Sequence, residues 1–184
     1  MAEYYLISQL PTLDGLGENT PLPITEERFL ELCKGLLKDR IYEKVANLTL
    51  IPSKEQERND NALIDAWNSG EKNLRLALCK VRSEKYNKPF ESKDLNFSNE
   101  LLKVAGNAIE MESPLEAENY LLSYRLSFLE ELRPMDNFSD DFIYYYALKL
   151  KLLYRMRKFS TQEGETVYKN IYDSIINGDR LEAI

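Results

Sequence analysis

The stretch Ser139–Phe159, SDDFIYYYALKLKLLYRMRKF, predicts a long helix at the centre of the protein. Ser139 can cap the first turn, because its hydroxyl can accept a hydrogen bond from a backbone N–H that has no partner within the helix. Apolar side chains cover well over half of the helix circumference. The narrow polar stripe that remains lies near Tyr144, Lys151, Arg155 and Lys158. A helix that is apolar on most sides is normally surrounded by other helices, so we expect this one to form the centre of the core.

Three consecutive tyrosines, Tyr144, Tyr145 and Tyr146, lie within this stretch. Successive residues of a helix point about 100° apart, so the three rings cannot form one stacking platform. We expect them to pack in the core with their hydroxyls reaching the surface.

The composition is that of a soluble globular protein. The chain has 184 residues, of which 43% are hydrophobic and 30% are charged, and a formal net charge of −7. That charge argues against general nucleic-acid binding, because a phosphate backbone would be repelled. The chain has no histidine, which removes the commonest general base and most zinc sites. Cys33 and Cys79 have no metal-like spacing and are expected to be reduced core cysteines.

No apolar run approaches the roughly 20 residues that a membrane-spanning helix needs, and the N-terminus lacks the pattern of a signal peptide. We therefore expect a cytoplasmic protein without direct membrane insertion. Any association with the inner membrane would be peripheral and would come through a partner.

Helical patterns account for most of the chain. They begin at Thr25, Ile41, Asn59 or Asp60, Ser98, Ser113, Ser139 and Thr161. The clearest start is Ser113-Pro114-Leu115-Glu116, which has the residues of a capping box with proline in the first turn. Asn177-Gly178 is expected to end the last helix.

Two points remain open. The first run of the chain, residues 1–11, fits either a strand or two turns of helix. Ser69-Gly70 could split residues 60–86 into two helices or leave one. In both cases the predicted fold is all-α, a single compact domain over residues 1–184 with about six to eight helices.

Clustered carboxylates are one candidate for chemistry. An enzyme that holds a divalent metal ion around Glu112, Glu116, Asp140 and Asp141 is an alternative to a non-enzymatic role. Solvated charges at helix ends explain these residues more simply. The chain has no GxxxxGK[ST], GxGxxG or GxSxG motif, so a glycine-rich nucleotide site is not expected.

Basic residues gather at the ends of two predicted helices, over residues 75–88 and 149–158. These could be solvated helix ends or a docking surface for an acidic protein partner. The six that we expect to contact a partner are Arg75, Arg82, Lys85, Lys151, Arg155 and Arg157. A helical RNA-binding module is a further alternative.

Four stretches resemble an uncharacterised bacterial family whose genes lie beside those of V-type (V/A-type) ATPase subunits. They are YYLISQLPTL (4–13), ITEERFLELCK (24–34), AWNSGEKNLRLALCKVRSEKY (66–86), and SPLEAENYLLSYRLSFLEEL with FIYYYALKLKLLYRMRKF (113–132 and 142–159). Together with the tail they cover most of the chain in the order of the family.

The family is more remotely similar to the connector (C) subunit of V/A-type ATPases, an all-helical protein between the rotor shaft and the membrane ring. The resemblance implies a non-enzymatic accessory or connector subunit that needs no cofactor or metal. Its partners would be V-type ATPase subunits of the central stalk or membrane ring, with no nucleic acid. Because the ATPase connector is built from repeated helical modules, an arrangement in two helical modules is also open.

Overall fold

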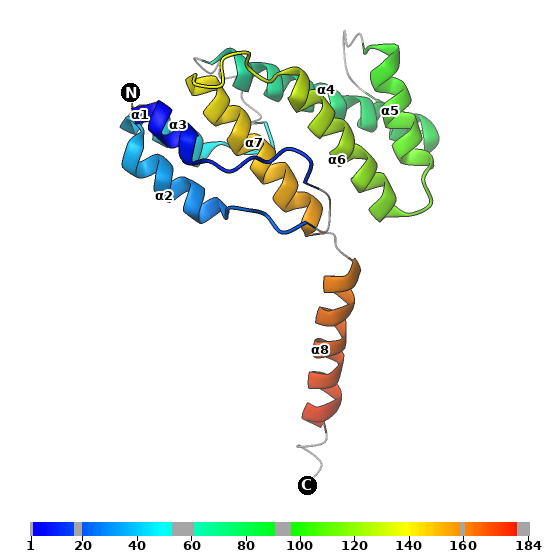
Figure 1. The fold of residues 1–184 in the computed structure, drawn as a ribbon. Helices are drawn as coiled ribbons and strands as arrows, with labels where there is room; N and C mark the ends of the chain where they lie inside the picture. The colour runs from blue at the N-terminus through cyan, green and yellow to red at the C-terminus, as the bar shows by residue number, and fades with distance from the viewer. Residues whose placement is uncertain (1, 17–19, 53–60, 91–96, 159–160, 180–184) are drawn as a thin grey trace.

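The computed structural model describes residues 2–16, 20–52, 61–90, 97–158 and 161–179, and every regular element within these ranges is a helix. This confirms the all-α prediction (Figure 1). The helices are α1 (Ala2–Gln9), α2 (Glu26–Leu36), α3 (Asp39–Asn47), α4 (Ala62–Lys85), α5 (Asn99–Glu110), α6 (Pro114–Glu131), α7 (Asp140–Arg157) and α8 (Thr161–Asp179).

Polar side chains cap the starts of several helices. The side chains of Thr25, Ser98, Ser113 and Ser139 each accept a hydrogen bond from the backbone N–H three residues further on, over 3.1 to 3.4 Å. These four predicted caps are confirmed. Asn61 caps α4 in the same way.

The stretch predicted to be central forms α7, which packs against α3, α4 and α6. Ten of its residues are buried, in one almost continuous run from Ile143 to Leu153. Tyr144 belongs to that run, so its predicted place in a polar stripe is wrong. Because α7 has neighbours on several sides, the apolar surface that covers most of its circumference is removed from water.

The tyrosine rings lie in the core as expected, but two of their hydroxyls find partners within the protein. The hydroxyl of Tyr145 donates to Oε1 of Glu130 over 2.7 Å, and that of Tyr146 donates to the carbonyl oxygen of Pro11 over 2.9 Å. The prediction that the hydroxyls reach the surface is therefore wrong for these two residues. A buried hydroxyl with no partner would be costly, which explains why each finds an acceptor.

The buried apolar residues form two clusters. The larger surrounds α7 and draws side chains from α1, α2, α3, α4 and α6. The smaller lies between α4, α5 and α6; its buried members are Leu74, Ala77, Leu78, Leu101, Val104, Ala105, Ala108 and Leu121. Helices α4 and α6 contribute to both clusters and thereby join them.

Residues 62–85 form one uninterrupted helix, which settles the open question at Ser69-Gly70. Gly70 lies where α6 comes close to α4. A Cβ at this position would overlap the ring of Phe128, so the absence of a side chain makes room for that ring. That ring also stacks on Trp67, with 6.2 Å between the ring centroids. The glycine thus marks a close approach between two helices rather than a break in one.

The two ends of the chain and the two cysteines can also be compared with the predictions. The first run of the chain is a helix, α1, and α8 continues one residue past Gly178. Cys33 is buried and Cys79 is exposed, both as free thiols, so the expectation of two core cysteines is wrong for Cys79. In Figure 1, α8 extends away from the body formed by the other helices.

Candidate functional site

The six basic residues predicted to contact a partner lie on two helices. Arg75, Arg82 and Lys85 belong to α4, and Lys151, Arg155 and Arg157 belong to α7. The structure brings only some of them together, and several make contacts within the protein. Their role in binding a partner stays a prediction.

Arg75 and Arg155 belong to one network of charges that crosses three helices. Nε of Arg75 donates to Oε1 of Glu71 over 2.7 Å. Arg125 of α6 donates to both carboxylate oxygens of Glu71, over 2.8 and 3.1 Å. At the other end, Arg155 donates from Nε to Oε1 of Glu118 over 2.9 Å. Nη1 of Arg125 lies 4.0 Å from the same Glu118 oxygen, so the network is continuous from α4 through α6 to α7.

The middle of this network is buried and its ends are not. Glu71 is 3% exposed and Arg125 is 9% exposed. The side chains of Arg75 and Arg155 keep 43% and 39% of their surface exposed, so both remain accessible from outside. The inner pair fixes α4 against α6, since a buried charge is stable only when it is paired.

No role was predicted for Glu71 or Arg125 from the sequence, although their positions in the apolar pattern carry a signal. Glu71 follows Trp67 by four residues and lies among the buried residues of α4. Arg125 follows Leu121 by four residues and precedes Leu129 by four. A charged residue within an apolar stripe must find a partner of opposite charge, which could have suggested this pair.

The remaining predicted residues have separate surroundings. Nζ of Lys151 forms an ion pair with Glu26 at the start of α2. Nζ of Lys85 donates to the carbonyl oxygen of Ile109 over 2.8 Å, which ties the end of α4 to the end of α5. Arg82 is exposed, whereas Nε and Nη2 of Arg157 are buried and have no hydrogen-bond partner among the described residues.

A second buried cation, Lys149, lies on α7. Its Nζ donates to Asp14 and to Glu130, each over 2.5 Å, and to the hydroxyl of Tyr145 over 3.2 Å. Burial alone would lower the pKa of Lys149, but these hydrogen bonds outweigh it and raise the pKa above its usual value. The hydrogen bond from Lys149 lowers the pKa of Asp14. Burial, with the hydrogen bond to Glu130, raises the pKa of Tyr145 to about 12.

An apolar hollow of about 340 Å³ lies beside Lys149. Its walls come from α1, from the segment after it and from the start of α7, and include Leu10, Phe138 and Phe142. The charged residues of its lining are Asp14, Arg133 and Lys149, and both cations form ion pairs with Asp14 and with Glu130, which lies outside the lining. The hollow therefore offers apolar surface without a preference for a charged ligand.

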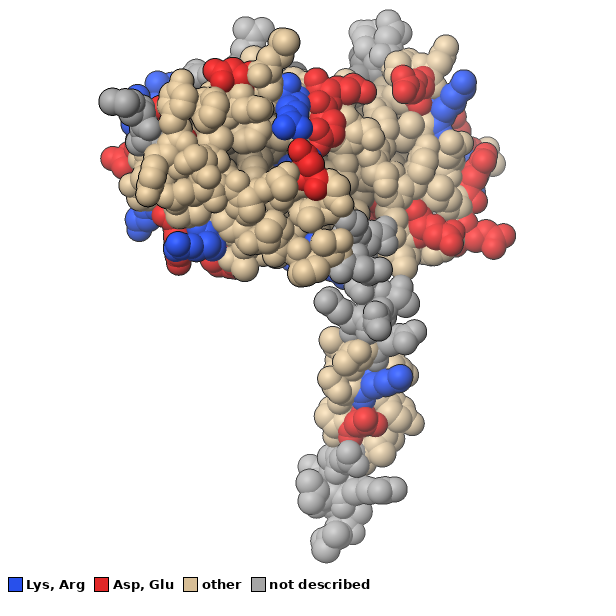
Figure 2. Space-filling model, viewed as in Figure 1, with Lys and Arg blue, Asp and Glu red and all other residues tan. Residues whose placement is uncertain are grey.

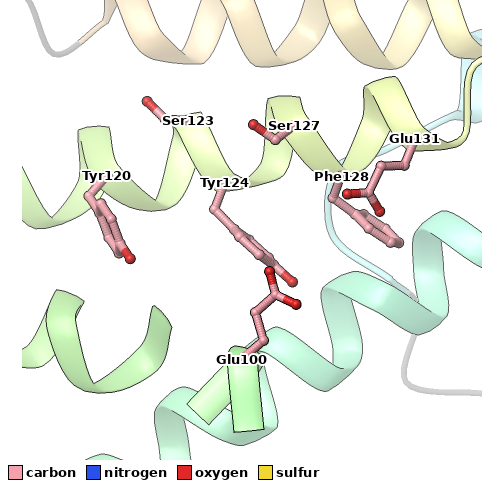
Figure 3. A pocket seen from close by; sticks show the side chains of 7 residues that line it. All are labelled: Glu100, Tyr120, Ser123, Tyr124, Ser127, Phe128 and Glu131. Carbon is pink, nitrogen blue, oxygen red and sulfur yellow. The ribbon is translucent and has the colours of Figure 1, made fainter. Parts of the chain in front are cut away.

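A second hollow, of about 400 Å³, lies where α5 meets α6, and we call it the α5–α6 hollow. Its lining residues are Glu100, Tyr120, Ser123, Tyr124, Ser127, Phe128 and Glu131. Figure 3 shows the three rings projecting from α6 towards α4 and α5, with Glu100 pointing towards Tyr124. Burial, followed by the negative charges of Glu100 and Glu131, raises the pKa of Tyr124. The α5–α6 hollow is thus lined by two carboxylates and by no basic side chain.

The carboxylates considered for a metal-dependent enzyme lie at the starts of two helices. Glu112 and Glu116 flank the start of α6, and Asp140 and Asp141 begin α7. In the described ranges, no three side chains of His, Cys, Asp or Glu gather as ligands for a metal ion. Asp141 instead accepts a hydrogen bond from the side-chain amide of Asn61, which links the starts of α7 and α4.

Helix α8 presents apolar side chains to solvent. Val167, Tyr168, Ile171, Tyr172, Ile175 and Ile176 are each between 42% and 68% exposed. They recur at intervals of four residues in two adjacent rows, 167/171/175 and 168/172/176, and we call them the α8 face. Together the two rows cover about half of the helix circumference.

No family model, curated protein or solved structure matches this chain. Within the described part of the chain, no helix is both long and apolar enough to span a bilayer.

Proposed function

We propose that this protein is a non-catalytic accessory or connector subunit of a V-type ATPase, which acts by binding other subunits through its helix faces. The observation that carries the proposal is the α8 face. Six apolar side chains, each about half exposed or more, lie on one side of a helix that extends from the body of the protein (Figure 1). Apolar surface of this extent on a soluble protein is typical of an interaction site.

The spacing of the α8 face favours another helix as its contact. Side chains four residues apart form ridges, and the ridges of one helix fit the grooves between those of another at a crossing angle of about −50°. The rows 167/171/175 and 168/172/176 are two such ridges. We therefore expect α8 to cross a helix of the partner obliquely, and not to form a long coiled coil.

The other helices supply the rigid part of a connector. The ion pairs of Glu71 and Lys149 hold α4, α6 and α7 and the segment after α1 in one arrangement. Closely packed interiors transmit displacement with little deformation. The body would in this way hold those of its helix faces that bind partners in a fixed arrangement.

The resemblance of four stretches to a family encoded beside V-type ATPase genes supports the choice of partner. Subunits of the central stalk or membrane ring are the expected ones. The expected basic contacts are Arg75, Arg82, Lys85, Lys151, Arg155 and Arg157. Those that are exposed would orient the encounter rather than supply most of the affinity, because exposed charges mainly affect association rate.

The proposal is tested by copurification with an affinity-tagged V-type ATPase from the native host. Wild-type protein should copurify, and Ile171→Asp with Ile175→Asp should abolish copurification by placing two charges on the α8 face. The matched control is Thr166→Asp with Asn170→Asp, which adds the same two charges to the opposite side of α8. Full assembly and activity of the ATPase in cells that lack this protein would refute the connector role.

A further inference from the structure

We propose that the α5–α6 hollow binds the ammonium or guanidinium group of a lysine or arginine side chain on a partner protein. The inference rests on the proposed function for the source of the ligand, a protein, but it concerns a surface other than the α8 face. Its test requires no ATPase component, so either proposal can fail without the other.

The α5–α6 hollow carries negative charge on its lining. Glu100 comes from the first turn of α5 and Glu131 from the last residue of α6, and both line the hollow. None of the seven lining residues is basic, and neither glutamate forms an ion pair with a described residue. This distinguishes the α5–α6 hollow from the hollow beside Lys149, where cations and carboxylates already balance.

The surface formed by α5 and the start of α6 also carries mainly negative charge. Figure 2 shows acidic side chains predominating over the part of this face that belongs to α5 and the start of α6. After burial, Glu100 and Glu131 also contribute to the raised pKa of Tyr124, because they disfavour a further negative charge at its hydroxyl. An anionic ligand would be repelled here, and a cationic one attracted.

Three aromatic rings also line the α5–α6 hollow. Tyr120, Tyr124 and Phe128 follow one another at intervals of four residues, so their rings lie along one side of α6 (Figure 3). A cation over an aromatic face is attracted by the ring quadrupole, with Arg and Lys the usual donors of that charge.

The mixture of rings and carboxylates suits a long basic side chain better than a metal ion. A divalent ion requires several oxygen ligands at once, and no group of three candidate ligands occurs in the described ranges. The methylene stem of Lys or Arg can cover apolar ring surface while its charged end reaches the carboxylates. The volume of about 400 Å³ leaves room for such a side chain.

The experiment is an NMR titration of the full chain, with isotope labels, by the blocked tripeptides Gly-Arg-Gly and Gly-Lys-Gly. Gly-norleucine-Gly is the uncharged control with a comparable apolar stem. We expect the basic peptides to shift the ring signals of Tyr120, Tyr124 and Phe128 with millimolar affinity. Glu100→Gln with Glu131→Gln should weaken binding by about five- to tenfold, because each exposed ion pair contributes modestly.

The matched control variant is Glu110→Gln with Glu112→Gln, which removes the same charge from exposed positions outside the hollow. It should bind as wild type does. The inference is overturned if the basic peptides cause no shift, if norleucine causes the same shift, or if the two double variants weaken binding equally. Capture by the ATPase has no bearing on any of these outcomes.

Discussion

Glu71 of α4 and Arg125 of α6 form a two-point ion pair in the interior, with 2.8 Å between Nε and Oε2 and 3.1 Å between Nη2 and Oε1. Both residues are at most 9% exposed. The pair lies on the two helices that contribute to both hydrophobic clusters. It therefore holds together the two parts of the core, and its disruption is expected to affect the whole body.

We predict that Glu71→Leu destabilises the protein by about 3–5 kcal/mol, because it leaves the charge of Arg125 buried without its main partner. Glu71→Leu with Arg125→Met should cost less than the single substitution, since no unpaired charge remains. Arg75→Gln, which removes an exposed partner of the same glutamate, should cost no more than about 1 kcal/mol. Urea unfolding of the four proteins measures these differences. A double variant less stable than the single one would contradict the account.

We predict that Gly70→Ala and Gly106→Ala change stability in opposite directions. Alanine favours a helix by about 1 kcal/mol over glycine at either position. At Gly106 a Cβ would meet no atom within 4 Å, so this gain should appear as increased stability. At Gly70 the Cβ would overlap the ring of Phe128, and overpacking of this kind costs about 1–3 kcal/mol. Thermal unfolding of both variants checks the signs, and equal stabilisation by both would show that Phe128 moves freely.

Asp14 should stabilise the protein above its unfolded pKa and lose that effect in acid. The folded pKa is lowered, chiefly by the hydrogen bond from Lys149, so folding favours the ionised form. We expect the stability advantage of wild type over Asp14→Asn to be constant above about pH 5, where the unfolded carboxyl of pKa about 3.9 is ionised. The advantage should shrink as the pH falls through the folded pKa.

Denaturant unfolding at several pH values measures this advantage. The same comparison in a Lys149→Met background is the control, because the hydrogen bond that lowers the Asp14 pKa is then absent. A pH-dependent advantage of unchanged size in that background would show that Lys149 is not its cause.

The two cysteines should differ in reactivity. Cys33 is fully buried, and burial raises the pKa of its thiol to about 12, so the reactive thiolate is scarce at neutral pH. Cys79 is exposed. We predict that a thiol reagent modifies one cysteine in the native protein and both after unfolding. Cys79→Ser should remove the native reaction, whereas Cys33→Ser should leave it; native modification of Cys33 would contradict the buried position.

Removal of α8 should leave the body folded. The apolar residues of α8 from Val167 to Ile176 are exposed, so little core is lost when the helix is removed. We predict that a chain ending at Lys158 unfolds within a few degrees of the full chain, since a change of 1 kcal/mol shifts the midpoint by about 2–4 °C at this size. Circular dichroism measures the midpoint. A decrease much larger than this would mean that α8 packs on the body in solution.

Most of the fold could be predicted because helix formation depends on nearby residues. Caps such as Ser113 and Ser139 bond to a backbone group three residues away, so their positions are written in the local sequence. The central place of α7 followed from an apolar surface too wide for a helix with one neighbour. The apolar rows of the α8 face also follow from local spacing, but that spacing does not show that the face is exposed.

The candidate sites were less predictable, because their members come from distant parts of the chain. The α5–α6 hollow joins Glu100 to Glu131 and to rings on α6, and this meeting depends on how two helices lie against each other. The prediction for Tyr144 failed for a related reason. A residue on the polar edge of a helical pattern is buried when a neighbouring helix covers that edge.

The sequence alone determined that this chain folds into helices, where most of them begin, and which helix lies at the centre. Those outcomes follow from hydrogen bonds and apolar spacing within about one turn. Tertiary structure alone decided the partners of the charges: Glu71 and Arg125 are 54 residues apart, and Asp14 and Lys149 are 135 apart. An ion pair depends on distance in space, and no local pattern specifies which carboxylate will lie within reach of a buried cation.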